Sequence, residues 1–288
     1  MTTTSSNSAR TAAAARAAHL IVDQPPTIFS DTLAADLLGD EADEYVSYHR
    51  VHGTHLVLAA ARGQVVCRSR FAEDSLAAAV RRGIGQYVIL GAGLDSFAYR
   101  SVLSPQVRVF EVDQRATQEW KRRQLAAARI AEPDNLVFVA CDFEAGSLAD
   151  DLVHGGLDPA EPAFVSWLGV TMYLTEAAIS RTLADLSALA PGSEIVADYM
   201  LPPPLRDEAA NVYVELVAPN AAERGEPWLS FLSPEQVSKL LSGHGFRPLR
   251  HVAQRDIGDQ AIWVRSDSLR PVELSLIVHA AKDVAGRS

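Results

Sequence analysis

Two features of the sequence have the residue types and spacing of a nucleotide-binding site. The turn Gly91-Ala92-Gly93 follows a short apolar run at 87–90, a pattern typical of a buried parallel strand that ends abruptly. A second apolar run, at 107–112, ends in Asp113, which lies 20 residues after Gly93. Glycines let the backbone approach a ligand closely, and a carboxylate at this distance can accept hydrogen bonds from a ribose diol. The spacing therefore predicts a nucleotide-type ligand at the carboxyl end of a doubly wound sheet.

Two residues inside this turn indicate which ligand is favoured. The dinucleotide fingerprint requires a third glycine or an alanine, so that a helix N-terminus can hold a pyrophosphate. This chain has Ser96 at that position and an extra acid, Asp95, which would repel phosphate. S-adenosylmethionine suits such a turn, because it has a ribose, an adenine and cationic groups but no phosphate. A methyltransferase-type site is therefore favoured over a dehydrogenase, and a turn that only joins strand to helix would leave the spacing to Asp113 unexplained.

The composition excludes several classes of function. A net charge of -10 over 288 residues argues against a protein that binds nucleic acid through its phosphates. The two cysteines, Cys67 and Cys141, have no metal-ligand spacing and favour a reducing compartment. No apolar run approaches the ~20 residues of a membrane helix, and the first residues do not resemble a secretory signal. We expect a cytoplasmic protein without a membrane or nucleic-acid partner; the oligomeric state is not predicted.

The order of the predicted elements defines the fold class. Residues 1–82 are predicted to form a helical lid, with one helix over 41–62 and another over 71–82. Residues 83–288 form the predicted core, in which strands and helices alternate as in a parallel sheet with helices on both faces. The last two strands, 246–252 and 274–280, have no convincing helix between them and predict an antiparallel end. The segment 200–231 is expected to be an irregular insert.

Ligands of such sheets bind outside the carboxyl ends of the strands. After the third strand, Asp142-Phe143 could serve an adenine, the carboxylate for its amine and the ring for its face. Asp142 could equally be a helix N-cap, and Phe143 could be a core residue. Tyr173 and Tyr199 follow the fourth and fifth strands and are predicted to orient an acceptor, although packing roles are equally compatible with both.

Several motifs together resemble the leucine carboxyl methyltransferase family, and its bacterial S-adenosylmethionine-dependent members in particular. They are VILGAGLDSFAYR, VFEVDQ, CDF, WLGVTMYLT, RSRFAED and GEPWLSFLSPEQV. This resemblance covers nearly the whole chain in the expected order. It implies a Rossmann-like class I methyltransferase fold in the α/β class, with seven strands, the last of them antiparallel, and an N-terminal helical lid.

The resemblance also implies roles for individual residues. Gly91 matches the glycine of the cofactor loop, Asp113 the ribose acid, and Asp142-Phe143 the adenine side. The cofactor carboxylate would be held by Arg68, with Arg70 as the close alternative. The cofactor-binding set predicted in this way consists of Arg68, Gly91, Ala92, Gly93, Asp113, Asp142, Phe143 and Leu168.

One departure from the family pattern limits the predicted substrate. Leu168 stands where the members that methylate a phosphatase have a glutamate. We therefore expect an O-methyltransferase for a carboxylate or hydroxyl of a small molecule, in secondary metabolism, with the segment 200–231 shaping the acceptor site. A carboxylate is ionised at pH 7 and needs no general base, and no Asp-His pair is evident, which favours a carboxylate. The alternatives are a methyltransferase-like binding protein with little activity, and methylation of a peptide or protein C-terminus.

A metal site is not predicted. His49, His52 and His55 are spaced i, i+3 and i+6, so on a helix they would drift around its surface and not converge on an ion.

Overall fold

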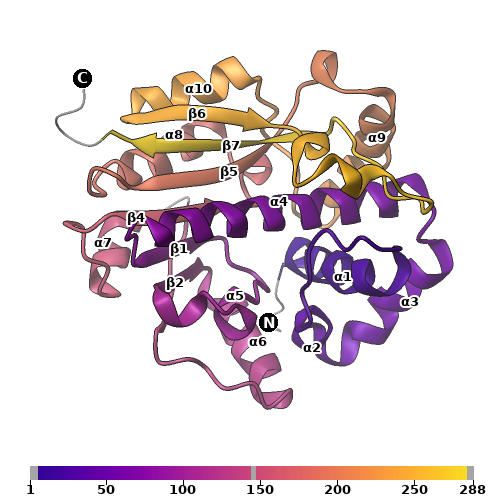
Figure 1. Cartoon of the computed structure of the whole chain (residues 1–288), viewed down its shortest axis with the longest axis horizontal. Helices are drawn as coiled ribbons and strands as arrows, with labels where there is room; N and C mark the ends of the chain where they lie inside the picture. The colour runs from indigo at the N-terminus through magenta and orange to yellow at the C-terminus, as the bar shows by residue number, and fades with distance from the viewer. Residues whose placement is uncertain (1–5, 144–146, 284–288) are drawn as a thin grey trace.

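The computed structural model describes residues 6–143 and 147–283, and its centre is a seven-stranded sheet (Figure 1). The strand order is β3-β2-β1-β4-β5-β7-β6. β1 to β5 are parallel, and β7 runs antiparallel to both of its neighbours, β5 and β6. The doubly wound sheet with an antiparallel end predicted from the sequence is thus confirmed. The strands are Gln86–Leu90 (β1), Arg108–Asp113 (β2), Leu136–Ala140 (β3), Ala163–Trp167 (β4), Glu194–Met200 (β5), Phe246–Val252 (β6) and Ser275–Lys282 (β7).

Helices cover both faces of the sheet, which explains why its central strands are apolar throughout. In β1, Val88 and Leu90 pack in one core cluster, with the helices at 148–154 (α7), 176–186 (α8) and 234–243 (α10). Tyr87 and Ile89 pack in another cluster, with the helices at 56–81 (α4) and 97–100 (α5). This alternation follows from the two-residue period of a strand. The helices of the core are Phe97–Arg100 (α5), Arg115–Ala127 (α6), Leu148–His154 (α7), Glu176–Leu186 (α8), Glu208–Glu223 (α9) and Pro234–Gly243 (α10).

The N-terminal helices differ from the prediction in where they break. They are Asn7–Val22 (α1), Ala34–Leu38 (α2), Ala42–His52 (α3) and Leu56–Arg81 (α4). The predicted helix over 41–62 is wrong, because the chain turns at Gly53 and His55 then caps α4 by accepting a hydrogen bond from the Val57 N–H. Gly63 does not end the helix either, since it lies within α4 and packs near Arg270 and Leu269.

Only part of the predicted lid segment lies away from the sheet. Figure 1 shows α4 running across the sheet, with α1 to α3 gathered beside its N-terminal half. Val66, Cys67 and Leu76 of α4 are fully buried among residues of the sheet. The division of the chain at residue 82 remains a prediction, but α4 shares a hydrophobic core with the sheet that follows it.

We expected the segment 200–231 to be irregular, but it contains the helix α9. Asp207 caps α9 through a 2.8 Å hydrogen bond from the Ala210 N–H, and the helix continues for 16 residues with Pro219 inside it. The prolines at 202–204 end β5 and form a short 3-10 turn before the cap. The Asp-Glu pair that begins α9 was the available signal, because acids favour a helix N-terminus.

None of the helices described combines the length and apolar character that a bilayer span requires. The longest, α4, has 26 residues but includes several arginines and acids.

Candidate functional site

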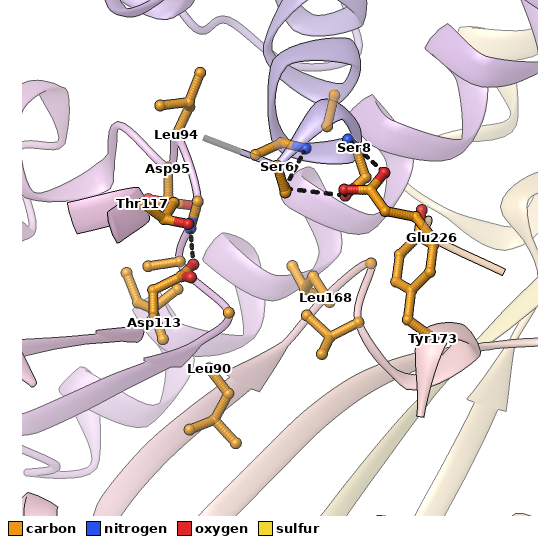
Figure 2. Close-up of a pocket in the computed structure, with 18 of the residues that line it drawn as sticks. Ser6, Ser8, Leu90, Leu94, Asp95, Asp113, Thr117, Leu168, Tyr173 and Glu226 are labelled. Carbon is orange, nitrogen blue, oxygen red and sulfur yellow. Dashed lines mark hydrogen bonds between the residues drawn. The ribbon is translucent and has the colours of Figure 1, made fainter. Parts of the chain in front are cut away.

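A cavity of about 470 Å³ lies at the carboxyl ends of β1, β2 and β4. Its volume is within the range of about 300–1,000 Å³ that small-molecule sites have. Leu90 pairs with Val112 on one side and with Trp167 on the other, so these three strands end level and the loops after them face one space. Figure 2 shows Asp113 on one side of the cavity and Tyr173 and Glu226 on the opposite side.

The predicted glycine turn forms one wall of the cavity. Gly91 and Gly93 both have left-handed backbones, with φ of 64° and 49°. A Cβ on Gly91 would lie 2.4 Å from Val170 Cγ2, and one on Gly93 would lie 3.0 Å from Ala9 Cβ. Both positions therefore exclude a side chain, because the turn packs directly against the loop after β4 and against α1. Ala92, between them, also lines the cavity.

Asp113 lies at the end of β2 and holds this turn in place. Its two carboxylate oxygens accept hydrogen bonds from the backbone N–H groups of Gly93, at 2.6 Å, and Gln114, at 2.7 Å. Burial raises the pKa of Asp113, and these two hydrogen bonds oppose that rise. The Thr117 side chain also contributes a hydrogen bond, and because each carboxylate oxygen can accept more than one, Asp113 keeps acceptor capacity toward the cavity.

The helix α1 closes the cavity from the other side of the turn. Arg16 donates from Nε to Asp31 at 2.7 Å and from Nη2 to the carbonyl oxygen of Leu94 at 2.6 Å. At the start of α1, Ser8 donates from its backbone N–H to Glu226 Oε2 at 3.0 Å and from Oγ to Oε1 at 3.4 Å. Figure 2 shows Ser8 and Glu226 side by side on the side of the cavity where Tyr173 lies. The first helix is therefore tied both to the glycine turn and to the loop after α9.

The structure distinguishes between the two candidate arginines. Arg68 lines the cavity, and its Nη1 lies 3.2 Å from Oδ2 of Asp198, whose Oδ1 accepts a 2.6 Å hydrogen bond from the Gly169 N–H. Arg70 lies elsewhere, with its Nε 2.6 Å from Asp74 on the partly exposed surface of α4. The position of Arg68 makes it the better candidate for a contact with a bound ligand.

The residues predicted for the adenine side are only partly brought together. Phe143 and Leu168 line the cavity. Asp142 is exposed and is not among the described residues that line it. Its contact with an adenine amine therefore stays a prediction.

The two predicted tyrosines lie on opposite faces of the sheet. Tyr173 lines the cavity, and burial together with the nearby Glu226 raises the pKa of its phenol, so the hydroxyl stays protonated at neutral pH. Tyr199 is buried beneath α8 and α10, and its hydroxyl lies 2.7 Å from Nδ1 of His251. Alternation along β5 turns Asp198 toward Arg68 and Gly169 and turns Tyr199 the other way, so the structure does not bring Tyr199 to the cavity and its acceptor role stays a prediction.

The three N-terminal histidines lie apart from the cavity. His49 is buried, and its Nδ1 lies 3.3 Å from Nη1 of Arg62. Burial, followed by the charge of Arg62, lowers the pKa of His49 to about 4. His52 packs its ring against Tyr48. Across residues 6–143 and 147–283, no group of three or more His, Cys, Asp or Glu side chains is placed to hold a metal ion.

The fold and the cavity together define a class I methyltransferase architecture. A solved methyltransferase candidate from Thermobifida fusca superposes with a TM-score of 0.62 at 18% identity, over 98% of this chain and 96% of that one. A DUF574 family protein from Streptomyces avermitilis gives 0.62 at 14% identity, over 97% and 98%. At these identities the two likenesses show the fold alone, and they confirm the predicted fold class.

Sequence comparison assigns the family. The leucine carboxyl methyltransferase family model matches residues 9–187. YktD of Bacillus subtilis, named as a candidate S-adenosyl-L-methionine-dependent methyltransferase, is 34% identical over 219 residues, which cover 75% of this chain and 72% of YktD. A protein of the same designation from Parafrankia is 30% identical over 232 residues, covering 78% and 72%. The chain belongs to the leucine carboxyl methyltransferase family, as its motifs predicted.

Three residues that line the cavity or orient its arginine were given no role from the sequence: Ser8, Asp198 and Glu226. Asp198 had a signal, since it is a carboxylate in an otherwise apolar strand and its neighbour Tyr199 points the other way. No local signal in the sequence pairs Ser8 with Glu226, because the two residues are 218 positions apart.

Proposed function

We propose that the cavity binds S-adenosyl-L-methionine and transfers its methyl group to an oxygen of a small molecule. The chain is an S-adenosyl-L-methionine-dependent methyltransferase, and the cofactor predicted from the sequence is the one in the names of its relatives. The observation that carries the site assignment is the carboxylate of Asp113, which is fixed by two backbone N–H groups and still has acceptor capacity toward the cavity.

The residues that line the cavity fit this cofactor in three respects. Asp113 can accept both ribose hydroxyls, and Phe143 offers a ring for the adenine face. Arg68 can hold a carboxylate, with its guanidinium oriented by Asp198. The two arginines among the described lining residues, Arg16 and Arg68, are each paired with a carboxylate, while Asp95 adds a negative charge. This charge balance disfavours a ligand with phosphates.

When bound, S-adenosyl-L-methionine supplies a sulfonium methyl group whose carbon–sulfur bond breaks, with its electron pair left on sulfur, as the acceptor oxygen bonds to the methyl carbon. The chain contributes mainly by positioning, because alignment of reacting atoms can supply much of the acceleration. The Ser8–Glu226 hydrogen bonds hold the start of α1 beside the acceptor side of the cavity. Tyr173, with its raised pKa, can donate a hydrogen bond to the acceptor oxygen but is a poor base.

The groups opposite Asp113 favour a hydroxyl acceptor over the carboxylate that the sequence had favoured. Glu226 lines the cavity near Tyr173, where its carboxylate would repel an anionic acceptor but could take the proton of a hydroxyl. Arg68 is the nearby cation, and Asp198 already neutralises it. The same balance argues against a peptide or protein C-terminus, whose carboxylate would need a cation of its own.

Transfer of a labelled methyl group tests this proposal. We expect the label on the hydroxyl of 4-hydroxyacetophenone and not on the carboxylate of 4-acetylbenzoate. Glu226→Gln should lower the turnover number for the phenol about 100-fold or more, since a positioned base is worth roughly that much. The glutamine oxygen can still accept the Ser8 N–H, and Glu223→Gln, an exposed acid at the end of α9, is the matched control. Label on the carboxylate, undiminished in Glu226→Gln, would exclude the hydroxyl assignment.

A further inference from the structure

A second cavity, of about 130 Å³, adjoins the first one beside Tyr173. Ser8 and Ala12 of α1, Arg68 of α4, Gly169 and Tyr173 line both cavities. The side cavity then extends between α1, α4 and α9, toward the end of β5. It therefore leads away from the part of the main cavity where the methyl group must be presented, and it does not overlap the Asp113 side.

Most of the walls of the side cavity are apolar or aromatic. Met172 and Met200 are buried there, and methionine side chains adapt readily to a ligand. The rings of Tyr213 and Trp228 lie nearly parallel, at 10°, with their centroids 6.2 Å apart. Val217 of α9 completes this wall. A flat apolar group fits such a lining better than a polar chain.

The polar atoms of the side cavity indicate what the occupant must carry. The indole Nε1 of Trp228 is buried within reach of the Tyr173 phenol, although no hydrogen bond of ordinary geometry joins the two groups. A buried tryptophan N–H usually finds a well-aligned acceptor, and a ligand oxygen beside Tyr173 would supply one here. Gln64 Nε2 makes only long contacts, 3.4 Å to Ser275 Oγ and 3.6 Å to Met200 Sδ.

The charge of the side cavity is close to neutral. Among the described residues that line it, Arg68 is the one ionised group, and Asp198 pairs with it at 3.2 Å. A charged occupant would lose its hydration without gaining a free partner, which is costly. The buried part of the ligand is therefore uncharged.

We propose that the side cavity is the acceptor subsite and holds one aromatic ring of an uncharged hydroxylated compound that also carries a carbonyl or ether oxygen. That oxygen accepts the Trp228 N–H, and the hydroxyl points back past Tyr173 to Glu226. The volume matches this occupant, since a cavity of about 150 Å³ in a protein core holds one benzene molecule. This inference rests on the proposed function, because it takes the main cavity as the cofactor site.

The first test uses two phenols that differ only in the hydrogen-bond acceptor. 4-Hydroxyacetophenone and 4-ethylphenol are titrated calorimetrically into the full chain loaded with S-adenosylhomocysteine. We expect the ketone to bind roughly two- to tenfold more tightly, which corresponds to one net hydrogen bond. Trp228→Phe keeps the aromatic wall but loses the N–H, so it should abolish this difference. Equal affinities in the wild-type protein, or a difference that survives in Trp228→Phe, would overturn the hydrogen bond to the indole.

The second test fills the cavity from α9. Val217→Phe should weaken both phenols at least tenfold and leave the affinity for S-adenosylhomocysteine unchanged. Leu216→Phe is the matched control, because Leu216 is the neighbouring residue and is 48% exposed. If the wild-type protein binds S-adenosylhomocysteine but neither phenol, or if Val217→Phe binds the phenols normally, the acceptor subsite is refuted and the cofactor site stands. If S-adenosylhomocysteine itself does not bind, the proposed function fails first.

Discussion

Replacement of Asp113 by asparagine tests the cofactor site most directly. The change keeps the shape of the side chain but leaves one acceptor oxygen and no charge. The backbone N–H groups of Gly93 and Gln114 both donate to Asp113, and one of them loses its acceptor in the variant. One ribose hydroxyl also loses a charged partner. Hydrogen bonds to charged groups are worth about 1.5–3 kcal/mol, so we expect affinity for S-adenosylhomocysteine to fall roughly 10- to 150-fold.

The stability of this variant should change much less than its affinity. Burial raises the pKa of Asp113, which means that the buried charge itself costs stability. Removing that charge therefore offsets part of the free energy lost with the hydrogen bond. We expect the melting temperature to stay within a few degrees of the wild-type value. Asp113 also precedes the N-cap of α6, Gln114, but no side-chain cap bond is present at that helix start.

Calorimetric titration and a thermal melt on the same sample decide between the two roles of Asp113. The matched control is Asp95→Asn, which removes the same charge from the same cavity. Its remaining oxygen can still accept the Phe97 N–H, now 2.8 Å away, and its affinity should be nearly unchanged. A lower melting temperature with unchanged affinity for Asp113→Asn, or equal losses of affinity in both variants, would refute the ribose assignment.

Three further predictions follow from the same contacts. Arg68→Met should weaken S-adenosylhomocysteine binding about tenfold or more in a titration, whereas Arg70→Met on the outer surface of α4 should not. The pKa of His49 is lowered from 6.5 to about 4. The neutral imidazole therefore contributes about 3 kcal/mol to the free energy of unfolding; this contribution is complete above pH 6.5 and is lost as the pH falls toward 4. Denaturant melts of His49→Asn should therefore lose less stability over that window than the wild type, and parallel curves would contradict this. Gly93→Ala should lower the unfolding free energy by about 1–2 kcal/mol because of its positive φ, while Gly243→Ala, in open space on α10, should not lower it.

The parts of the fold that depend on local patterns were predictable. The apolar runs, the glycine turn and Asp113 located β1 and β2, and strand-helix alternation gave the parallel sheet. The break at Gly53 and the helix α9 within 200–231 were missed, although His55 and Asp207 cap the two helices locally. Tertiary contacts and a tolerated proline hid the true helix lengths. Gly63 continues a helix since α4 packs against the C-terminal loop there, and Pro219 lies inside α9 although proline usually ends a helix.

The candidate site shows the same division. Gly91, Gly93 and Asp113 are close in the chain and were predicted together. The choice of Arg68 over Arg70 required the structure, because helical spacing alone does not say which side faces the cavity. The alternation of side chains along β5 could have predicted that Asp198 and Tyr199 point to opposite faces, so that only one of them can face the site.

The docking of α1 has a consequence for how the protein is made on the ribosome. Ser8 binds Glu226, which is 218 residues further along, and Arg16 binds the Leu94 carbonyl, 78 residues further along. At a synthesis rate of about 5–20 residues per second, the first helix waits roughly 10–40 s before its later partner has been translated. Its packing face consists largely of alanines, which expose little apolar surface during that interval. Thus α1 is translated well before Glu226 but can complete its contacts at the cavity only afterwards, and its composition suits the delay.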